Sequence, residues 1–155
     1  MDALELKIPP PVVALVLALS MWVVAALTTT LQVTYLLRLR VSVAVALALL
    51  GGAVSLAGTI AFRKARTTVN PMKPERASSL VIGGVYRFTR NPMYVGLLLV
   101  QIAWAAFLCA PWSLVGPLAF AVYITRYQIN AEERVLMSLF GEAYARYKSR
   151  VRRWV

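Results

Sequence analysis

The sequence contains no histidine, a single cysteine and only six acidic residues against seventeen basic ones. The absence of histidine excludes His-based general acid–base catalysis, His-ligated metals and Ser-His or Cys-His catalytic pairs. The single cysteine, Cys109, excludes an internal disulfide. Its position in an apolar run favours a structural thiol over a nucleophile. We therefore expect no metal site, and any chemistry must depend on carboxylates, tyrosines, lysines or a bound cofactor.

Charge of either sign is scarce along most of the chain. Charged residues make up 15% of the sequence and apolar residues 60%, against averages of about 25% and 45–50%. The charges occur in blocks that separate uncharged runs long enough to cross a bilayer. We predict an all-α polytopic membrane protein in which residues 1–155 form a single domain. The net charge of +11 then reflects basic loops beside anionic lipid, so the expected partner is the lipid bilayer and not nucleic acid.

Four apolar segments predict four transmembrane helices, because about 20 helical residues cross the ~30 Å hydrocarbon core. A short loop, residues 32–40, joins the first two and carries Arg38 and Arg40. The third follows Pro92, a residue suited to the first turn of a helix. The fourth is interrupted by Gly116 and Pro117. The predicted spans are residues 12–31, 41–62, 93–110 and 112–129.

Two basic regions flank the last two spans. Residues 63–91 carry seven basic residues and several prolines, which favour an ordered loop over a helix. After the fourth span, Asn130 predicts a helix N-cap with Glu133 three positions later. Apolar and aromatic residues then recur at helical spacing between basic ones. This pattern predicts a basic amphipathic helix in the membrane interface over residues 130–155, broken at Gly141.

The distribution of basic residues predicts the orientation. If both termini are cytoplasmic, fifteen of the seventeen Lys and Arg residues lie on the inner side, and only Arg38 and Arg40 lie outside. The inverted topology would contradict the positive-inside tendency. We therefore expect an integral membrane protein whose active site faces the cytoplasm, in the plasma (inner) membrane if the source is prokaryotic.

Two polar clusters are predicted to meet on this cytoplasmic side. One is the glycine, basic and aromatic stretch of residues 83–96. In the other, four polar residues step by 3, 4 and 3 positions and so share one face of a continuous helix. Such a face suits a zwitterionic ligand, and polar groups at the mouth of a membrane helix indicate function. The alternative is that the arginine snorkels and the acidic pair only favours a helix start. The second cluster comprises Tyr123, Arg126, Asn130 and Glu133, with Glu132 beside them.

Residues 90–96, Arg-Asn-Pro-Met-Tyr-Val-Gly, follow a Gly-Val-Tyr-Arg run. This stretch resembles the Arg-His-Pro-x-Tyr-x-Gly signature of the isoprenylcysteine carboxyl methyltransferase-like proteins, which the related phospholipid methyltransferases share. The Glu132-Glu133 pair, the Phe140-Gly141 step and the tyrosines that follow resemble the C-terminal pattern of the same family. The resemblance covers roughly residues 60–155, with both motifs in the family's order and spacing.

The resemblance implies a membrane methyltransferase that uses S-adenosyl-L-methionine without a Rossmann domain. It places the donor pocket near the cytoplasmic face, with the signature stretch as one wall and the acidic pair as the other. No catalytic residue is assigned, but Arg90 and Asn91 are expected to align the reactants. Asn91 stands where the family usually has histidine, and its amide cannot act as a titrating base. The residues expected to bind the donor are Gly84, Tyr86, Arg90, Asn91, Pro92, Tyr94, Arg126, Asn130, Glu132 and Glu133.

Methyl transfer from a sulfonium needs alignment and a dry site more than proton transfer. A chain without histidine therefore favours a carboxylate or thiol acceptor, as in isoprenylcysteine carboxyl methylation. A lipophilic acceptor would enter from the bilayer, with its polar end near Arg63, Arg66 or Asn70. The alternatives are a phospholipid N-methyltransferase, an NADPH-dependent sterol-reductase-like enzyme with a similar signature stretch, and a non-enzymatic membrane scaffold.

Overall fold

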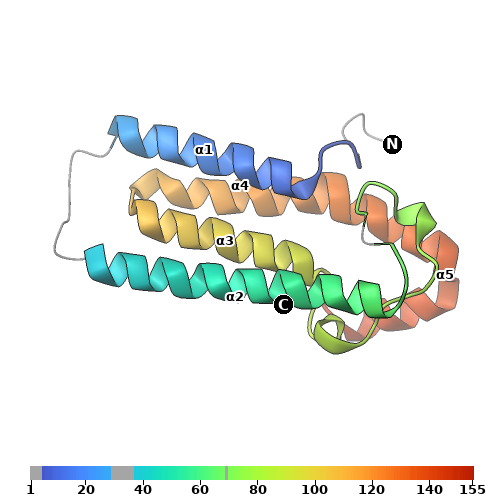
Figure 1. Ribbon diagram of the computed structural model, residues 1–155. Helices are drawn as coiled ribbons and strands as arrows, with labels where there is room; N and C mark the ends of the chain where they lie inside the picture. The colour runs from blue at the N-terminus through green and yellow to red at the C-terminus, as the bar shows by residue number, and fades with distance from the viewer. Residues whose placement is uncertain (1–4, 29–36, 69) are drawn as a thin grey trace.

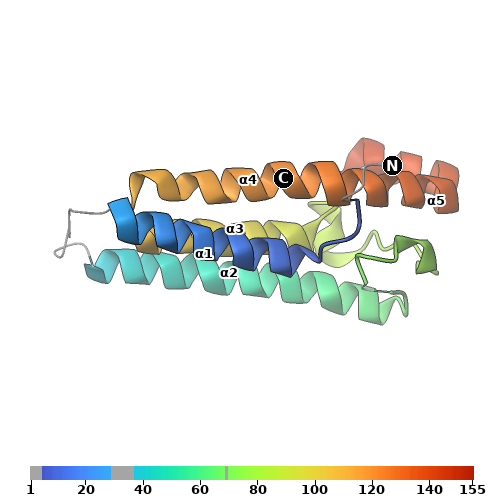
Figure 2. The same ribbon diagram turned by 90° about the horizontal axis from the view of Figure 1, so that it is seen from above.

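The computed structural model describes residues 5–28, 37–68 and 70–155, and every regular element within them is a helix. The predicted all-α fold is thereby confirmed. The first four α-helices run alternately in opposite directions as a bundle (Figures 1 and 2). The α-helices are α1 (Pro10–Thr28), α2 (Leu37–Lys64), α3 (Pro92–Leu108), α4 (Val115–Ile124) and α5 (Asn130–Arg150). Short helical segments are η2 (Pro74–Arg76), η3 (Gly84–Arg87), η4 (Pro111–Leu114) and η5 (Thr125–Ile129).

Among the described helices, α1 and α2 are long and apolar enough to cross a membrane. They contain 19 and 28 residues with mean hydropathies of 2.3 and 2.1, and at 1.5 Å per residue they span about 29 and 42 Å. Both expose large apolar side chains, including Leu27 at 81% and Leu49 at 69%. An apolar surface of this extent suits contact with hydrocarbon better than contact with water. Helix α3 is also apolar but shorter, at 17 residues.

Each predicted span coincides with helical structure, but the bounds differ. Residues 29–36, which include the end of the first predicted span and most of the predicted loop 32–40, lie outside the described residues. The loop prediction is wrong for residues 37–40, because α2 begins at Leu37. Arg40 therefore lies in a helix, where its guanidinium donates a hydrogen bond to the Phe107 carbonyl at the end of α3. Pro92 takes the first-turn position of α3, as predicted.

The fourth predicted span continues into α5 without interruption, through the π-helical segment η5. The prediction that Asn130 caps a new helix is wrong, since its backbone is helical and the preceding helical turns already satisfy the backbone donors that a cap would serve. The break at Gly141 is confirmed: its φ of 46° and ψ of −122° are non-helical, and glycine adopts positive φ without steric penalty.

Helices α2 and α3 pack closely through small residues. A Cβ placed on Gly96 would lie 2.4 Å from the Gly51 carbonyl oxygen and 2.1 Å from Ser55 Oγ. Ser55 also donates a hydrogen bond to the Met93 carbonyl across the seam, at 3.1 Å. Gly51 and Gly96 therefore serve close helix packing. This seam fixes the start of α3, which carries the signature stretch, against the end of α2.

One end of the bundle gathers the polar and irregular parts of the chain. The start of α1, the segment between α2 and α3, and helix α5 all lie at this end, with the α3–α4 connection at the other (Figure 1). Two buried clusters support it. The first centres on Tyr94, Phe120 and Ile124, and the second on the tyrosines Tyr86, Tyr144 and Tyr147. The candidate site lies between these two clusters.

Candidate active site

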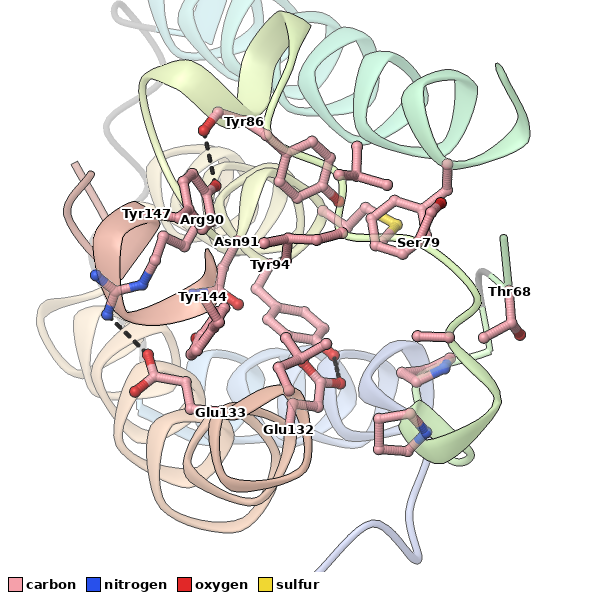
Figure 3. A pocket seen from close by; sticks show the side chains of 18 of the residues that line it. Thr68, Ser79, Tyr86, Arg90, Asn91, Tyr94, Glu132, Glu133, Tyr144 and Tyr147 are labelled. Carbon is pink, nitrogen blue, oxygen red and sulfur yellow. Dashed lines mark hydrogen bonds and ion pairs between the residues drawn. The ribbon is translucent and has the colours of Figure 1, made fainter. Parts of the chain in front are cut away.

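A cavity of about 100 Å³ opens between the start of α3, helix η3, helix α5 and the loop that follows α2. A single water needs only about 10–15 Å³, so the space is a genuine hollow. Figure 3 shows tyrosines, two glutamates and loop residues surrounding it. The signature stretch and the Glu132-Glu133 pair of the second predicted cluster therefore line one cavity. Its polar and aromatic lining includes Thr68, Asn70, Ser79, Tyr86, Arg90, Asn91, Tyr94, Glu132, Glu133, Tyr144 and Tyr147.

Aromatic rings form much of the wall. Tyr86 from η3 lies 5.3 Å from the Phe62 ring, measured between centroids, and Tyr147 donates a hydrogen bond to the Tyr86 carbonyl at 2.7 Å. Tyr144 is 2% exposed. Burial raises the pKa of Tyr144 to about 12, with the nearby charge of Glu133 adding to the effect, and it raises the pKa of Tyr86 and Tyr147 further. The phenols therefore stay neutral and present uncharged π faces to the cavity.

Glu132 is the carboxylate held against Tyr94. Its Oε1 accepts a hydrogen bond from the Tyr94 hydroxyl at 2.5 Å and one from Gln128 Nε2 at 2.7 Å. Gln128 also donates to the Pro71 carbonyl, which links the carboxylate to the loop after α2. Burial raises the pKa of Glu132 to about 7, and the two hydrogen bonds offset only part of that rise. Glu132 therefore titrates near neutral pH.

Glu133 has the opposite environment. Arg90 contacts its Oε1 at 2.8 Å, and Arg153 and Lys148 contact its Oε2 at 2.9 and 3.2 Å. Burial opposes ionisation of this carboxyl, but hydrogen bonds from Arg153, Arg90 and Lys148 outweigh it and lower the pKa of Glu133 to about 2. Glu133 is therefore a permanent anion that is already neutralised by cations of the protein itself.

Residues 151–154, the tail segment, fold back over the signature stretch. Asn91 Nδ2 donates a hydrogen bond to the Arg153 carbonyl at 2.9 Å, and the backbone N–H of Arg90 donates to the Arg152 carbonyl at 3.0 Å. The Arg90 guanidinium also donates to the Val151 carbonyl at 2.5 Å. Trp154 Nε1 donates to Thr125 Oγ1 on η5 at 3.3 Å. The polar atoms of the signature stretch thus serve largely to hold this tail in place.

The structure brings seven of the predicted site residues to the cavity and leaves the others away from it. Gly84 begins η3 with a positive φ of 60°, Pro92 is buried against α2, and Arg63 and Arg66 are exposed. Of Tyr123, Arg126, Asn130 and Glu133, which were predicted to share one helix face, only Glu133 lines the cavity. The π-helical segment η5 lies within this run, and Arg126 contacts the Tyr127 ring, 5.6 Å from its centroid. The predicted residues that line the cavity are Asn70, Tyr86, Arg90, Asn91, Tyr94, Glu132 and Glu133.

Sequence reasoning missed several residues that build the site. Gln128 is 2% exposed, and its signal was a lone amide inside an apolar span, four positions before Glu132. Tyr144 and Tyr147 were counted only in the pattern of the predicted interfacial helix, but they are buried in a cluster with Tyr86. Arg153 was counted only as a basic tail residue, yet it donates two hydrogen bonds to Glu133. No local pattern marks Thr68 and Ser79 as cavity residues.

Comparison with known proteins places the chain among methyltransferases. A family model described as phospholipid methyltransferase matches residues 39–143. The chain is 31% identical to a protein-S-isoprenylcysteine O-methyltransferase of Xenopus laevis, over 86% of this chain and 47% of that protein. It is 32% identical to protein-S-isoprenylcysteine O-methyltransferase B of Arabidopsis thaliana, over 66% of this chain and 52% of the relative.

Methanethiol S-methyltransferase 1 of Bradyrhizobium diazoefficiens is 41% identical over 43% of this chain and 22% of that protein. No solved structure matches the chain. The chain spans about half the length of the isoprenylcysteine methyltransferases that it resembles. Because the family model covers more than half of the chain, the resemblance seen in the sequence is confirmed: this protein belongs to the phospholipid methyltransferase family.

Proposed function

We propose that the protein is an S-adenosyl-L-methionine-dependent methyltransferase that works at the membrane on a lipophilic acceptor carrying a carboxylate or a thiol. One observation carries this proposal: a cavity walled by neutral tyrosines and a carboxylate, placed at the polar end of an apolar helical bundle. Such a cavity suits a cation with apolar substituents, and the bundle suits a hydrophobic partner.

The lining fits a sulfonium donor. The faces of Tyr86, Tyr94 and Tyr144 offer negative electrostatic potential to a cation, as aromatic walls do for quaternary ammonium ligands. Glu132 adds an anionic group that titrates near neutral pH. These residues would hold the donor, which supplies an electrophilic methyl group when bound. Arg90 and Asn91 would act indirectly, because their polar groups position the tail segment over the cavity.

The acceptor would approach from the bilayer side of the bundle. We propose that the bundle crosses the membrane four times, with α1 and α2 as two of the spans and with both termini in the cytoplasm. This topology would put the cavity at the inner face of the membrane. Asn70 lines the cavity on the side of the loop that follows α2, so it is placed to contact the polar end of the acceptor. Arg63 and Arg66 are exposed nearby on the same segment and would contact lipid headgroups.

Calorimetric titration of the detergent-solubilised protein tests the donor assignment. We expect binding of S-adenosyl-L-methionine and of its demethylated product, and no binding of NADPH. Transfer of labelled methyl from the donor to an extract of membrane lipids and small lipophilic molecules then tests the activity. Binding of NADPH alone would favour a reductase, and binding of neither compound would favour a scaffold; each result would overturn the proposal.

Phospholipid N-methylation is the second candidate, favoured by the description of the family model that matches most of the chain. It would use the same cavity with an amine acceptor. An amine must lose a proton before or during transfer, and its ordinary pKa near 10 makes this harder than for a thiol. Label that enters ethanolamine phospholipids in the transfer experiment, and not thiols or carboxylates, would identify this activity.

A further inference from the structure

We propose that the groove between α1 and α2 binds an anionic phospholipid, with one acyl chain along the groove and the phosphate at Arg40. Among the described residues, none lines both this groove and the cavity of the candidate site, so the lipid site does not depend on the proposed function. Three features carry it: the size of the groove, its hydrocarbon lining and the cation at its end.

The groove has a volume of about 830 Å³ and lies between α1 and α2, with α3 as its floor. Both of these helices pack against α3 (Figure 1). Small residues keep the space open, because Ala14 and Ala18 of α1 and Ala44 and Ala48 of α2 line it. Residues four positions apart lie on one helix face, so each helix turns a face of small residues toward the groove. Ligand sites in proteins usually enclose about 300–1,000 Å³, and this groove has that size.

The surface of the groove is hydrocarbon. Its two lining residues with polar atoms in their side chains, Gln101 and Trp104 of α3, donate hydrogen bonds to the carbonyls of Ala14 and Ala18 on α1, at 2.6 and 2.9 Å. Gln101 is 2% exposed, and its Oε1 has no partner among the described residues but is enclosed. The groove therefore offers an occupant apolar contacts, which suits an acyl chain better than a polar ligand.

Arg40 lies at the end of the groove farther from the candidate site. It stands one helical turn before Ala44, on the same face of α2. Its guanidinium donates a hydrogen bond to the carbonyl of Phe107, which also lines the groove. Helices α1 to α4 contain no Asp or Glu, so none of them offers Arg40 a counter-ion. Because arginine pairs with phosphate through charge-assisted hydrogen bonds, an anionic head group would supply the missing charge.

The length of the groove matches one leaflet of a bilayer. From Ala48 to Arg40, α2 rises about 12 Å at 1.5 Å per residue, and one leaflet contributes about 15 Å of the hydrocarbon core. Leu15, Leu19 and Trp22 line the groove, yet each is more than half exposed, so the groove is open along one side. A phospholipid can therefore place one chain in the groove while its second chain stays in the surrounding bilayer.

A lipid in this position would join the two helices that the groove separates. Helices α1 and α2 each contact α3, and the acyl chain would add a contact surface for both. Because a ligand that binds only the folded state stabilises it, we expect the anionic lipid to raise the unfolding temperature of the delipidated protein. At 100 times its Kd the rise should be about 5–10 °C.

Photo-crosslinking locates the lipid. The purified, delipidated protein in an uncharged detergent is irradiated with a phosphatidylglycerol that carries a diazirine in one acyl chain, and the labelled peptides are identified by mass spectrometry. We expect labels on the residues of α1, α2 and α3 that line the groove. Unlabelled dioleoyl phosphatidylglycerol should displace the photoreactive lipid. Dioleoyl phosphatidylcholine should displace it less well, because its choline cation would lie beside Arg40.

Two variants with matched controls test the two ends of the site. Arg40→Gln should lower the affinity for phosphatidylglycerol by about 10–100-fold, the usual contribution of a hydrogen bond to a charged group, and should remove the preference over phosphatidylcholine. Arg38→Gln removes the same charge from an exposed position on another face of α2 and should change neither. Ala48→Phe should fill the groove and abolish labelling there, whereas Ala53→Phe, at an exposed position of the same helix, should not.

The opposite results would overturn the proposal. Labels confined to the basic end of the bundle, equal displacement by the two phospholipids, or equal losses in Arg40→Gln and Arg38→Gln would show only diffuse attraction between lipid and cations. Displacement by oleate at lower concentrations than by phosphatidylglycerol would make a free fatty acid the occupant. A dimer in native mass spectra that forms in competition with labelling would make the occupant a second copy of this chain. If Ala48→Phe does not fold, the label positions in the wild type and the comparison of the two arginine variants still decide.

Discussion

At the scale of single residues, two glutamates that are adjacent in the chain have different acidities because different side chains surround them. Glu132 and Glu133 are adjacent on α5, yet burial beside neutral donors raises the pKa of the first to about 7, and three cations hold that of the second at about 2. Pairs of carboxyl groups with separated pKa values are typical of sites that divide binding from proton transfer. The division here is set by which residues reach each carboxylate.

Glu133→Gln should destabilise the fold more than any exposed charge substitution. It leaves Arg90, whose side chain is 8% exposed, without its counter-ion, and removal of one partner from a buried ion pair costs about 3–5 kcal/mol. Because folding lowers the pKa of Glu133, its stabilising effect is complete above its ordinary pKa of 4.5 and disappears as the pH falls toward 2. Thermal unfolding in detergent at neutral and acidic pH measures both effects.

Glu142→Gln on the exposed face of α5 is the matched control and should leave the unfolding temperature almost unchanged. If the two variants unfold at the same temperature at pH 7, the cations around Glu133 do not stabilise the site. If Glu133→Gln lowered the unfolding temperature as much at low pH as at pH 7, packing and not charge would be the cause.

At the scale of elements, the close packing of α2 against α3 determines where the start of α3, and Tyr94 with it, lies relative to α2. Gly96 stands two residues after Tyr94 and contacts the backbone of α2 at Gly51. The signature glycine therefore has a packing role: any side chain there would push the start of α3, and Tyr94 with it, away from α2.

Gly96→Ala should lower stability by about 1–3 kcal/mol, as overpacking does in tight interfaces, because the added Cβ would meet the Gly51 carbonyl at 2.4 Å. Gly52→Ala is the control on the facing helix. A Cβ at Gly52 meets nothing within 4 Å, and alanine has the higher helix propensity by about 1 kcal/mol. We expect the unfolding temperature to fall for Gly96→Ala and to rise or stay unchanged for Gly52→Ala. The same response from both would contradict a close seam.

The elements also show what sequence could and could not predict. Long apolar runs predicted the helices, because crossing a bilayer leaves few other solutions. Arg90, Asn91 and Tyr94 of the signature stretch line one cavity. The register change at η5 was not predictable, since its residues would fit an ordinary α-helix and only packing selects the π turn. The helical spacing predicted a helix through residue 155, but α5 ends at Arg150 and the tail segment folds back. Its contact with Asn91 joins residues 62 positions apart, so it could not be read from local sequence.

At the scale of the whole molecule, polarity is concentrated at one end of the bundle. The candidate site, the loop after α2 and helix α5 lie together there, and Cys109 follows α3 at the opposite end (Figure 1). Such an asymmetry suits a protein whose site lies at one face of a membrane. Because Cys109 lies at the end of the bundle opposite the candidate site, its thiol can report which side of the membrane that end faces.

We therefore expect a membrane-impermeant maleimide to label Cys109, which is exposed, from the outside of sealed right-side-out membrane vesicles. In a Cys109→Ser background, Ser149→Cys places the thiol on exposed α5, and labelling should then require opening of the vesicles. Mass measurement of the labelled protein provides the readout. The reversed pattern would invert the topology, and labelling of both positions without lysis would show that the helices do not span the bilayer.

The fold-back of residues 151–154 has a consequence for biosynthesis. Arg90 is synthesised 43 residues before Glu133, and Asn91 is synthesised 62 residues before Arg153. At about 5–20 residues per second of translation, several seconds separate the synthesis of Arg90 from that of its counter-ion Glu133. The contacts that complete the candidate site can therefore form only after helices α3 and α4 have been synthesised.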